Sequence, residues 1–366
     1  MLVVSVAGGC GSGETNETVG ESSAGVSATT VATVTAPSTT SSTTTTTTTT
    51  TTARAGTPAT TSSTESSHPP STESTAASTS TPAQDVGMAW TVVDVVDDAR
   101  TTAELLGPDG SVVLAASPTR TIPTVLLYPG RSGGGEAATP AQVEPRPLVV
   151  WMNGLGGRAT AEDPLLLALY EAGYVVAAPN IPEIAEPVAH PGGYVHQPAD
   201  VSAVIDALSA PGGGVPDGLA AVVDTERIGV VGHSIGGSGV YGAAFHDCCR
   251  DERISAAAVF AAPRIDFDGG GFRFSGVPLL IIHGSVDLVI APEQSEMVRN
   301  EAEDAVLAIL NDADHFQPVY GLDRPDVLVL TEELLRAFLD VHVAGTASPD
   351  DFTIVLETYS DRISAR

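Results

Sequence analysis

Short apolar segments alternate with segments of helical periodicity from about residue 90 onward, and this alternation limits the folds open to the chain more than any other feature. The run at 147–152 is apolar throughout, as in a strand buried on both faces, whereas 198–208 carries apolar residues at helical spacing. The pattern predicts an α/β fold, with a mostly parallel central sheet and helices on both faces. We expect strands at 90–96, 121–128, 147–152, 174–178, 227–231, 254–261, 278–282 and 305–310, and helices at 163–172, 198–208, 235–244, 292–299 and 331–343.

The segment before this domain has a composition that opposes folding. Residues 11–84 are mostly Thr, Ser, Ala, Gly, Glu and Pro, with unbroken Thr from 43 to 52. Because few large apolar side chains are present, burial cannot offset the loss of chain entropy, and we expect a disordered linker. The α/β domain should cover residues 85–345. Residues 346–366 are expected to form a C-terminal tail, in which 352–356 is either an extra edge strand or part of a packed segment.

The first ten residues resemble the end of a bacterial lipoprotein signal. An apolar run at 2–7 is followed by Gly8, Gly9 and Cys10, and in such signals the Cys is lipidated and becomes the new N-terminus. The run is shorter than in a usual signal and has no basic region before it. An ordinary flexible N-terminus is the alternative. We expect an extracytoplasmic protein, either a cell-surface lipoprotein anchored to the membrane through Cys10 or a secreted protein.

The charge and the cysteine content exclude several classes of function. The formal net charge is −29 and the chain has no Lys, so it offers no basic cluster for nucleic acid or for an anionic membrane surface. Its three cysteines lack the spacing of a metal site or of a disulfide framework. Cys248 and Cys249 are adjacent, and form either a bond between neighbours or two packed thiols. We expect a monomer without a metal ion or a cofactor.

The pentapeptide Gly232-His233-Ser234-Ile235-Gly236 matches the pattern Gly-x-Ser-x-Gly. It follows the expected strand at 227–231 and opens a helix rich in Gly and Ala. A nucleophile elbow has this context, because its sharp strand-to-helix turn exposes the Ser hydroxyl above the sheet and leaves no room for a Cβ at the flanking Gly positions. The alternative is a glycine-rich turn with a structural Ser. We expect Ser234 to be the nucleophile.

A serine nucleophile requires a base, and the base requires an orienting acid. In folds with this elbow, the acid and then the His follow the Ser along the chain. Asp287 lies just past the strand at 278–282, and His315 lies on the loop after the strand at 305–310. We therefore expect Asp287 as the acid and His315 as the general base that takes the Ser234 proton. Packing, capping or surface roles are expected for the other candidates: His190, His196, His233, His283 and Asp314.

The oxyanion of an acyl-transfer intermediate needs two backbone N–H donors. Ile235 follows the nucleophile and should supply one of them. The loop at 153–157 reads Asn-Gly-Leu-Gly-Gly, and such a loop allows the backbone to approach a substrate closely. We expect Leu155 to supply the second donor.

With these residues in place, the domain resembles serine hydrolases of the group that includes platelet-activating-factor acetylhydrolase, dienelactone-hydrolase-like proteins and bacterial cutinases. The resemblance covers about residues 117–338 and is carried by short segments at 120–129, 153–157, 197–201, 232–237, 248–251, 284–287 and 314–316. It implies the α/β-hydrolase fold, a catalytic triad of Ser234, Asp287 and His315, and no metal or organic cofactor.

Four departures from this group bear on the substrate. Asn153 replaces the His or Pro often found before the oxyanion Gly, and Leu155 stands where polyester-degrading cutinases carry an aromatic residue. Residues 262–264 lack the Trp of those enzymes, and Ser234 replaces the Cys of true dienelactone hydrolases. These features favour an enzyme that hydrolyses carboxylic esters with short-chain or lipid-like acyl groups. A polyester or cutin hydrolase is the alternative enzyme, and a non-catalytic surface binding module on a hydrolase scaffold is the alternative from another class.

Overall fold

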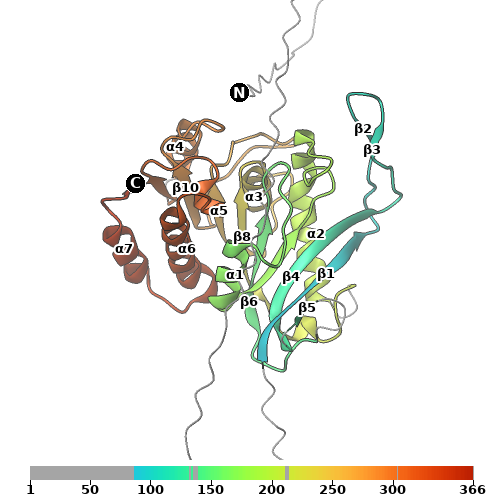
Figure 1. The fold of residues 1–366 in the computed structure, drawn as a ribbon, viewed down its shortest axis with the longest axis horizontal. Helices are drawn as coiled ribbons and strands as arrows, with labels where there is room; N and C mark the ends of the chain where they lie inside the picture. Colours follow the sequence, from blue (N-terminus) through green and yellow to red (C-terminus); the bar gives the residue numbers. More distant parts are fainter. Residues whose placement is uncertain (1–85, 132, 135–138, 211–213, 303, 366) are drawn as a thin grey trace, which may run out of the picture. The chain divides into compact units, whose positions relative to one another are not determined.

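The computed structural model describes residues 86–365 except 132, 135–138, 211–213 and 303. The expected lipidation site at Cys10 and the expected linker at 11–84 lie outside the described residues. Six strands, the first of them β1 (Val86–Asp97), precede the first helix, and after residue 152 strands largely alternate with helices, as the sequence pattern predicts (Figure 1).

The described residues form a mixed ten-stranded sheet. Besides β1, the sheet contains β4 (Arg120–Arg131), β5 (Gly133–Gly134), β6 (Arg146–Met152), β7 (Val175–Pro179), β8 (Val223–His233), β9 (Ile254–Phe260), β10 (Leu279–Gly284), β11 (Val306–Leu310) and β12 (Ile363–Ala365). The strand order is β12-β11-β10-β9-β8-β6-β7-β4-β1-β5, and the strands from β11 through β7 are parallel to one another. β4, β1 and β12 pair antiparallel at the two sides. The mostly parallel sheet is therefore confirmed. A separate hairpin of β2 (Leu105–Leu106) and β3 (Val112–Leu114) was not expected.

Helices cover both faces of the sheet (Figure 1). They are α1 (Pro164–Glu171), α2 (Gln197–Ser209), α3 (Ile235–Phe245), α4 (Glu293–Glu301), α5 (Gln317–Tyr320), α6 (Pro325–Leu339) and α7 (Pro349–Thr358), with shorter turns η1 (Pro191–His196), η2 (Leu219–Ala221) and η3 (Asp340–Ala344). Buried residues of α2, α3 and α4 share one apolar cluster with one face of the sheet, and those of α1, α6 and α7 share a second cluster with the other. In β6, Leu148 and Val150 point into the first cluster and Val149 and Trp151 into the second. Burial on both faces explains why the central strands are apolar throughout.

Of the two alternatives for residues 352–356, the structure shows the packed segment, and the domain extends past the expected boundary at 345. Residues 352–356 lie inside helix α7, whose start is capped by the Ser348 backbone N–H donating to the Asp351 carboxylate at 2.8 Å. Phe352 is buried and packs on Phe338 of α6, and the edge strand is β12, further along the chain. Residues 346–365 therefore belong to the domain. The helix expected at 331–343 also begins earlier, at Pro325, because proline fits the first helical position.

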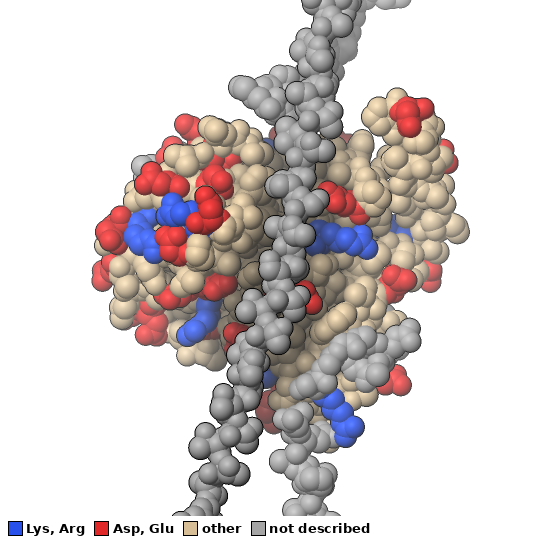
Figure 2. Space-filling model, in the orientation of Figure 1, with Lys and Arg blue, Asp and Glu red and all other residues tan. Residues whose placement is uncertain are grey.

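The surface of the described residues is acidic with interspersed arginines. Figure 2 shows Asp and Glu side chains spread over the visible face, with Arg side chains in small groups among them. Several arginines of the described residues pair with carboxylates, and Arg253 lies 2.6 Å from Asp206 and 2.6 Å from Asp251. None of the helices in the described part of the chain combines the length and the apolar character needed to cross a membrane.

Candidate active site

Ser234 occupies a strained turn between β8 and α3. Its backbone has φ 53° and ψ −125°, a conformation that residues other than Gly rarely adopt. The turn closes tightly: a Cβ at Gly232 would lie 2.7 Å from the carbonyl of Gly236, and a Cβ at Gly236 would lie 2.3 Å from the carbonyl oxygen of Met152. Glycine is therefore required on both sides of Ser234. This is the geometry expected of a nucleophile elbow.

Asp287 and His315 form a short hydrogen bond. Nδ1 of His315 lies 2.6 Å from Oδ2 of Asp287, and both side chains are buried. The other carboxylate oxygen accepts hydrogen bonds from the backbone N–H groups of Val289 and Ile290 at 2.7 and 2.9 Å. Burial alone would raise the pKa of Asp287, but hydrogen bonds from His283, His315 and the backbone outweigh it and hold that pKa well below its usual range. Asp287 is therefore a carboxylate that fixes the His315 ring with Nδ1 as the donor.

Sheet topology and one glycine bring the two residues together. β10 and β11 are parallel neighbours, so the turn carrying Asp287 and the loop carrying His315 leave the same edge of the sheet. A Cβ at Gly284 would lie 2.2 Å from the carbonyl oxygen of Ala313 and 2.5 Å from that of Asp314. The backbone N–H of Val286 donates to the Ala313 carbonyl at 3.0 Å. The two segments thus touch through their backbones, which a larger residue at 284 would prevent.

His233 connects the Ser234 turn to the His315 loop. Its Nε2 lies 2.9 Å from the backbone carbonyl oxygen of His315, so Nε2 carries the proton and donates. The two rings are 4.7 Å apart, and within the described residues Nδ1 of His233 has no hydrogen-bond partner. Burial, with the neighbouring His315, lowers the pKa of His233 to about 3. The packing role expected for His233 therefore includes a hydrogen bond that anchors the backbone of His315.

His283 is a site residue that the sequence analysis assigned only to packing. Its Nε2 lies 3.1 Å from Oδ2 of Asp287 and 2.9 Å from the carbonyl oxygen of Ile290, and its Nδ1 lies 2.7 Å from Oγ of Ser295. The side chain is fully buried at the end of β10. The sequence signal is the short spacing, because His283 is at the end of a strand and Asp287 lies four residues later on the turn that follows it.

The loop at 153–157 lies against the nucleophile. A Cβ at Gly154 would be 3.2 Å from Cβ of Ser234 and 2.9 Å from Nδ1 of His233. Leu155 follows at the surface, 41 % exposed, while Ile235 is the first residue of α3 directly after Ser234. The backbone N–H of Gly157 donates to the Gly154 carbonyl at 2.9 Å, which turns the loop back on itself. The two expected oxyanion donors therefore lie on segments that flank Ser234.

The remaining sequence candidates lie outside this arrangement. His196 is half-buried, 3.9 Å from Glu183, and the His190 ring packs against Gly192. Asp314 caps the turn before α5, since its Oδ1 accepts from the N–H groups of Phe316 and Gln317 at 2.9 Å each.

Cys248 and Cys249 are joined in a disulfide. His246 lies beside them, with Nδ1 3.1 Å from Sγ of Cys248. These three are the group among the described residues whose atoms are close enough to share a metal ion. Because metal-binding cysteines are thiolates, the bonded sulfurs do not offer that ligand set.

Comparison with known proteins gives evidence of fold alone. No known family model and no curated protein sequence matches the chain. The fold does match solved structures, among them a ferulic acid esterase from Streptomyces cinnamoneus, with 22 % identity and a TM-score of 0.51. The alignment covers 74 % of this chain and 94 % of that one. With the sheet topology, this likeness shows that the chain has the α/β-hydrolase fold.

Proposed function

We propose that the protein is a serine hydrolase that cleaves carboxylic esters through an acyl-enzyme on Ser234. The observation that carries the proposal is the 2.6 Å hydrogen bond between Asp287 and His315. The loop of His315 is hydrogen-bonded to His233, which directly precedes the strained Ser234. A glycine-rich turn with a structural Ser would need neither the backbone strain nor the buried carboxylate–imidazole pair. Strain of this kind persists only where the surrounding structure enforces it, and it gathers at functional sites.

Acylation follows from the proton positions. Because Nδ1–H of His315 donates to Asp287, Nε2 carries a lone pair and can take the proton of the Ser234 hydroxyl. Oγ then bonds to the ester carbonyl carbon, and the negative charge moves to the carbonyl oxygen, where the N–H groups of Leu155 and Ile235 would stabilise it. When the carbon–alkoxide bond breaks, the proton on Nε2 passes to the leaving alcohol.

Deacylation repeats the sequence with water. His315 takes one water proton, the hydroxide oxygen bonds to the acyl carbon, and the second oxyanion forms at the same donors. Collapse breaks the bond to Oγ, returns the proton from Nε2 to Ser234 and releases the carboxylic acid. Asp287 stays ionised throughout and stabilises the imidazolium in both halves.

Substrates with short-chain or lipid-like acyl groups suit the side chains around this site. Leu155, Leu288 and Phe316 are apolar, exposed, and adjacent in sequence to Gly154, Asp287 and His315. They would contact an apolar acyl or alcohol group. The ferulic acid esterase likeness adds hydroxycinnamate esters to the substrates worth testing.

The test combines turnover with covalent labelling. Wild type and Ser234→Ala are assayed on p-nitrophenyl esters of increasing acyl length and on methyl ferulate, and both are treated with a fluorophosphonate probe. We expect kcat to fall about 10⁴- to 10⁶-fold in Ser234→Ala, with loss of labelling and an unchanged circular dichroism spectrum. Turnover within tenfold of wild type in Ser234→Ala would overturn the proposal, and an unlabelled, inactive wild type would favour a binding module.

A further inference from the structure

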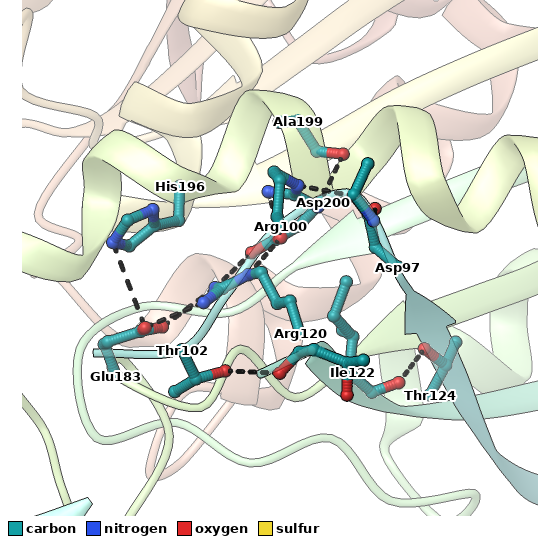
Figure 3. Close-up of polar contacts among 12 residues, drawn as sticks. Asp97, Arg100, Thr102, Arg120, Ile122, Thr124, Glu183, His196, Ala199 and Asp200 are labelled. Atoms are coloured by element: carbon teal, nitrogen blue, oxygen red, sulfur yellow. Dashed lines mark hydrogen bonds and ion pairs between the residues drawn. The ribbon is translucent and has the colours of Figure 1, made fainter. Parts of the chain in front are cut away.

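Arg120 lies at the start of β4 with its guanidinium fully buried between two carboxylates (Figure 3). Its Nη1 and Nη2 each lie 2.8 Å from one oxygen of Glu183. On the other side, Nε and Nη2 lie 2.5 and 2.6 Å from the two oxygens of Asp200 on α2. Both contacts are bidentate. In this arrangement a guanidinium fixes the orientation of a carboxylate and also balances its negative charge.

A second arginine completes the cluster from the surface. Nη1 of Arg100 lies 2.8 Å from Asp200, and its Nη2 donates to the Ala199 carbonyl at 3.1 Å. Asp200 is thus shared by two arginines, while Glu183 is held by Arg120 (Figure 3). Although burial opposes ionisation, the hydrogen bonds and charge of Arg120 lower the pKa of Glu183. Glu183 is therefore a buried carboxylate pinned to the β4–α2 framework.

Glu183 sits in the segment that touches the loop of the expected oxyanion donor. The next residue, Ile184, accepts a hydrogen bond at its carbonyl from the N–H of Gly156 at 2.9 Å, and Gly156 forms a bridge with Ala185. Gly156 directly follows Leu155 and has φ +74°, so its backbone conformation depends on glycine. The path from Arg120 to Leu155 therefore runs through the ion pair with Glu183, the backbone from Glu183 to the Ile184 carbonyl, the hydrogen bond to Gly156 and the Leu155–Gly156 peptide bond.

The η1 turn and the residue before it pack closely against Glu183. A Cβ at Gly193 of η1 would lie 2.4 Å from Cβ of Glu183, and the backbone N–H of His190 donates to the Glu183 carbonyl at 2.6 Å. Arg158, just after the oxyanion loop, donates back to the Glu186 carbonyl at 3.3 Å. The two loops are thus connected by hydrogen bonds at Gly156 and at Arg158, and Glu183 joins this contact to Arg120 of β4.

We propose that Glu183, held by Arg120, is a positioning residue that fixes the oxyanion loop at Leu155 against Ser234. The inference rests on the proposed function, since it assigns the task of the loop in that reaction. It also assigns a role to the segments at 120–129 and 197–201, which contain Arg120 and Asp200 and take no part in the triad chemistry. Loss of the Glu183 carboxylate frees the segment at 183–186 and displaces the Leu155 N–H from the position of the oxyanion.

The experiment compares Glu183→Ala and Glu183→Gln with Asp251→Asn as a matched control. Asp251 is also a buried carboxylate paired with an arginine, Arg253, and the hydrogen bonds described for its side chain go to Arg253 and Ser202, outside the oxyanion loop. We expect kcat on a p-nitrophenyl ester to fall about 10- to 100-fold in Glu183→Ala with KM within threefold, because the oxyanion donors act on the transition state. The affinity for a trifluoromethyl ketone, which forms a tetrahedral adduct with an active-site serine, should weaken by a similar factor. Glu183→Gln keeps one acceptor for Arg120 and should recover part of the loss.

Each outcome decides the inference. Asp251→Asn should melt at a lower temperature but retain kcat within twofold. If Glu183→Ala does not fold, the folded Glu183→Gln carries the test. Wild-type kcat and ketone affinity in a folded Glu183 variant, or an equal loss of kcat in Asp251→Asn, would overturn the positioning role. Failure of the proposed function would show differently, as ester turnover retained in Ser234→Ala.

Discussion

Nε2 of His283 lies 3.1 Å from Oδ2 of Asp287, the same oxygen that accepts the hydrogen bond from His315. Ser295 at 2.7 Å can donate its hydroxyl proton to Nδ1 of His283, which leaves Nε2–H as the donor toward Asp287 and the Ile290 carbonyl. With the two backbone donors on Oδ1, the carboxylate is held from four directions. The Asp287 carboxylate is thus also oriented by groups other than His315.

A variant of His283 tests this orientation. His283→Phe keeps a ring in the buried space but removes the donor to Asp287. We expect kcat/KM to fall about 10- to 100-fold, because that factor corresponds to the free energy that a hydrogen bond to a charged group contributes. The measurement is steady-state hydrolysis of a p-nitrophenyl ester. Ser295→Ala is the control, since it removes only the group that sets the tautomer and should have a smaller effect. An active His283→Phe, within twofold of wild type, would assign His283 to packing alone.

Substitution of Asp287 should separate orientation from folding. Asp287→Asn keeps the shape of the side chain, but its amide can present an N–H to His315 and select the wrong tautomer, so we expect kcat to fall about 10⁴-fold. His315→Ala should be inactive to a similar degree. The assay uses purified variants with circular dichroism as the check on folding. A fully active Asp287→Asn would mean that another carboxylate orients the base.

Local patterns predicted the parts of the site that depend on neighbouring residues. Gly232 and Gly236 indicate a turn that closes within five residues, so a short sequence pattern is enough to predict this turn. Asp287 and His315 were predicted from their order along the chain. Their hydrogen bond, however, depends on the register of β10 and β11 and on the contact of Gly284 with the Ala313 carbonyl, neither of which a single sequence displays.

Long-range polar contacts were beyond the sequence analysis for the same reason. Arg120 meets Glu183 and Asp200 across 63 and 80 residues, and nothing in the local sequence pairs them. β12 has three residues, too few to show the alternation that identifies a strand, so the sequence pattern predicts only a tail there. The fold class was predicted without these contacts and without β12, because it follows from the repeated strand–helix order.

The location of the protein is a prediction from sequence, since Cys10 lies outside the described residues. If Cys10 is lipidated, two acyl chains on its glyceryl group would give stable membrane attachment, where one chain gives only marginal binding. We expect membrane fractionation and incorporation of labelled palmitate in cells that express the full gene. Cys10→Ala should be released from the membrane and unlabelled. A Cys10→Ala protein that stays in the membrane fraction, or an unlabelled wild type, would contradict the anchor.

His233 predicts how stability depends on pH. In the folded chain its pKa is lowered from 6.5 to about 3, because burial disfavours the charged ring. Between these two values the unfolded chain binds a proton that the folded chain does not, so the free energy of unfolding decreases as the pH falls from 6.5 toward 3. The slope from this group approaches about 1.4 kcal/mol per pH unit, and its contribution is constant above pH 6.5.

The variant His233→Gln isolates that contribution. Glutamine keeps a donor for the His315 carbonyl but does not titrate, so its stability should change less with pH than that of wild type. We expect urea unfolding at pH 7 and pH 5 to show a wild-type loss larger than the variant's by about 2 kcal/mol, since the difference accumulates over roughly 1.5 pH units. Other titrating groups are common to both proteins and cancel in the comparison. Parallel losses in the two proteins would show that His233 is already charged in the folded state near pH 5, and that the ring is not held neutral between Ser234 and His315.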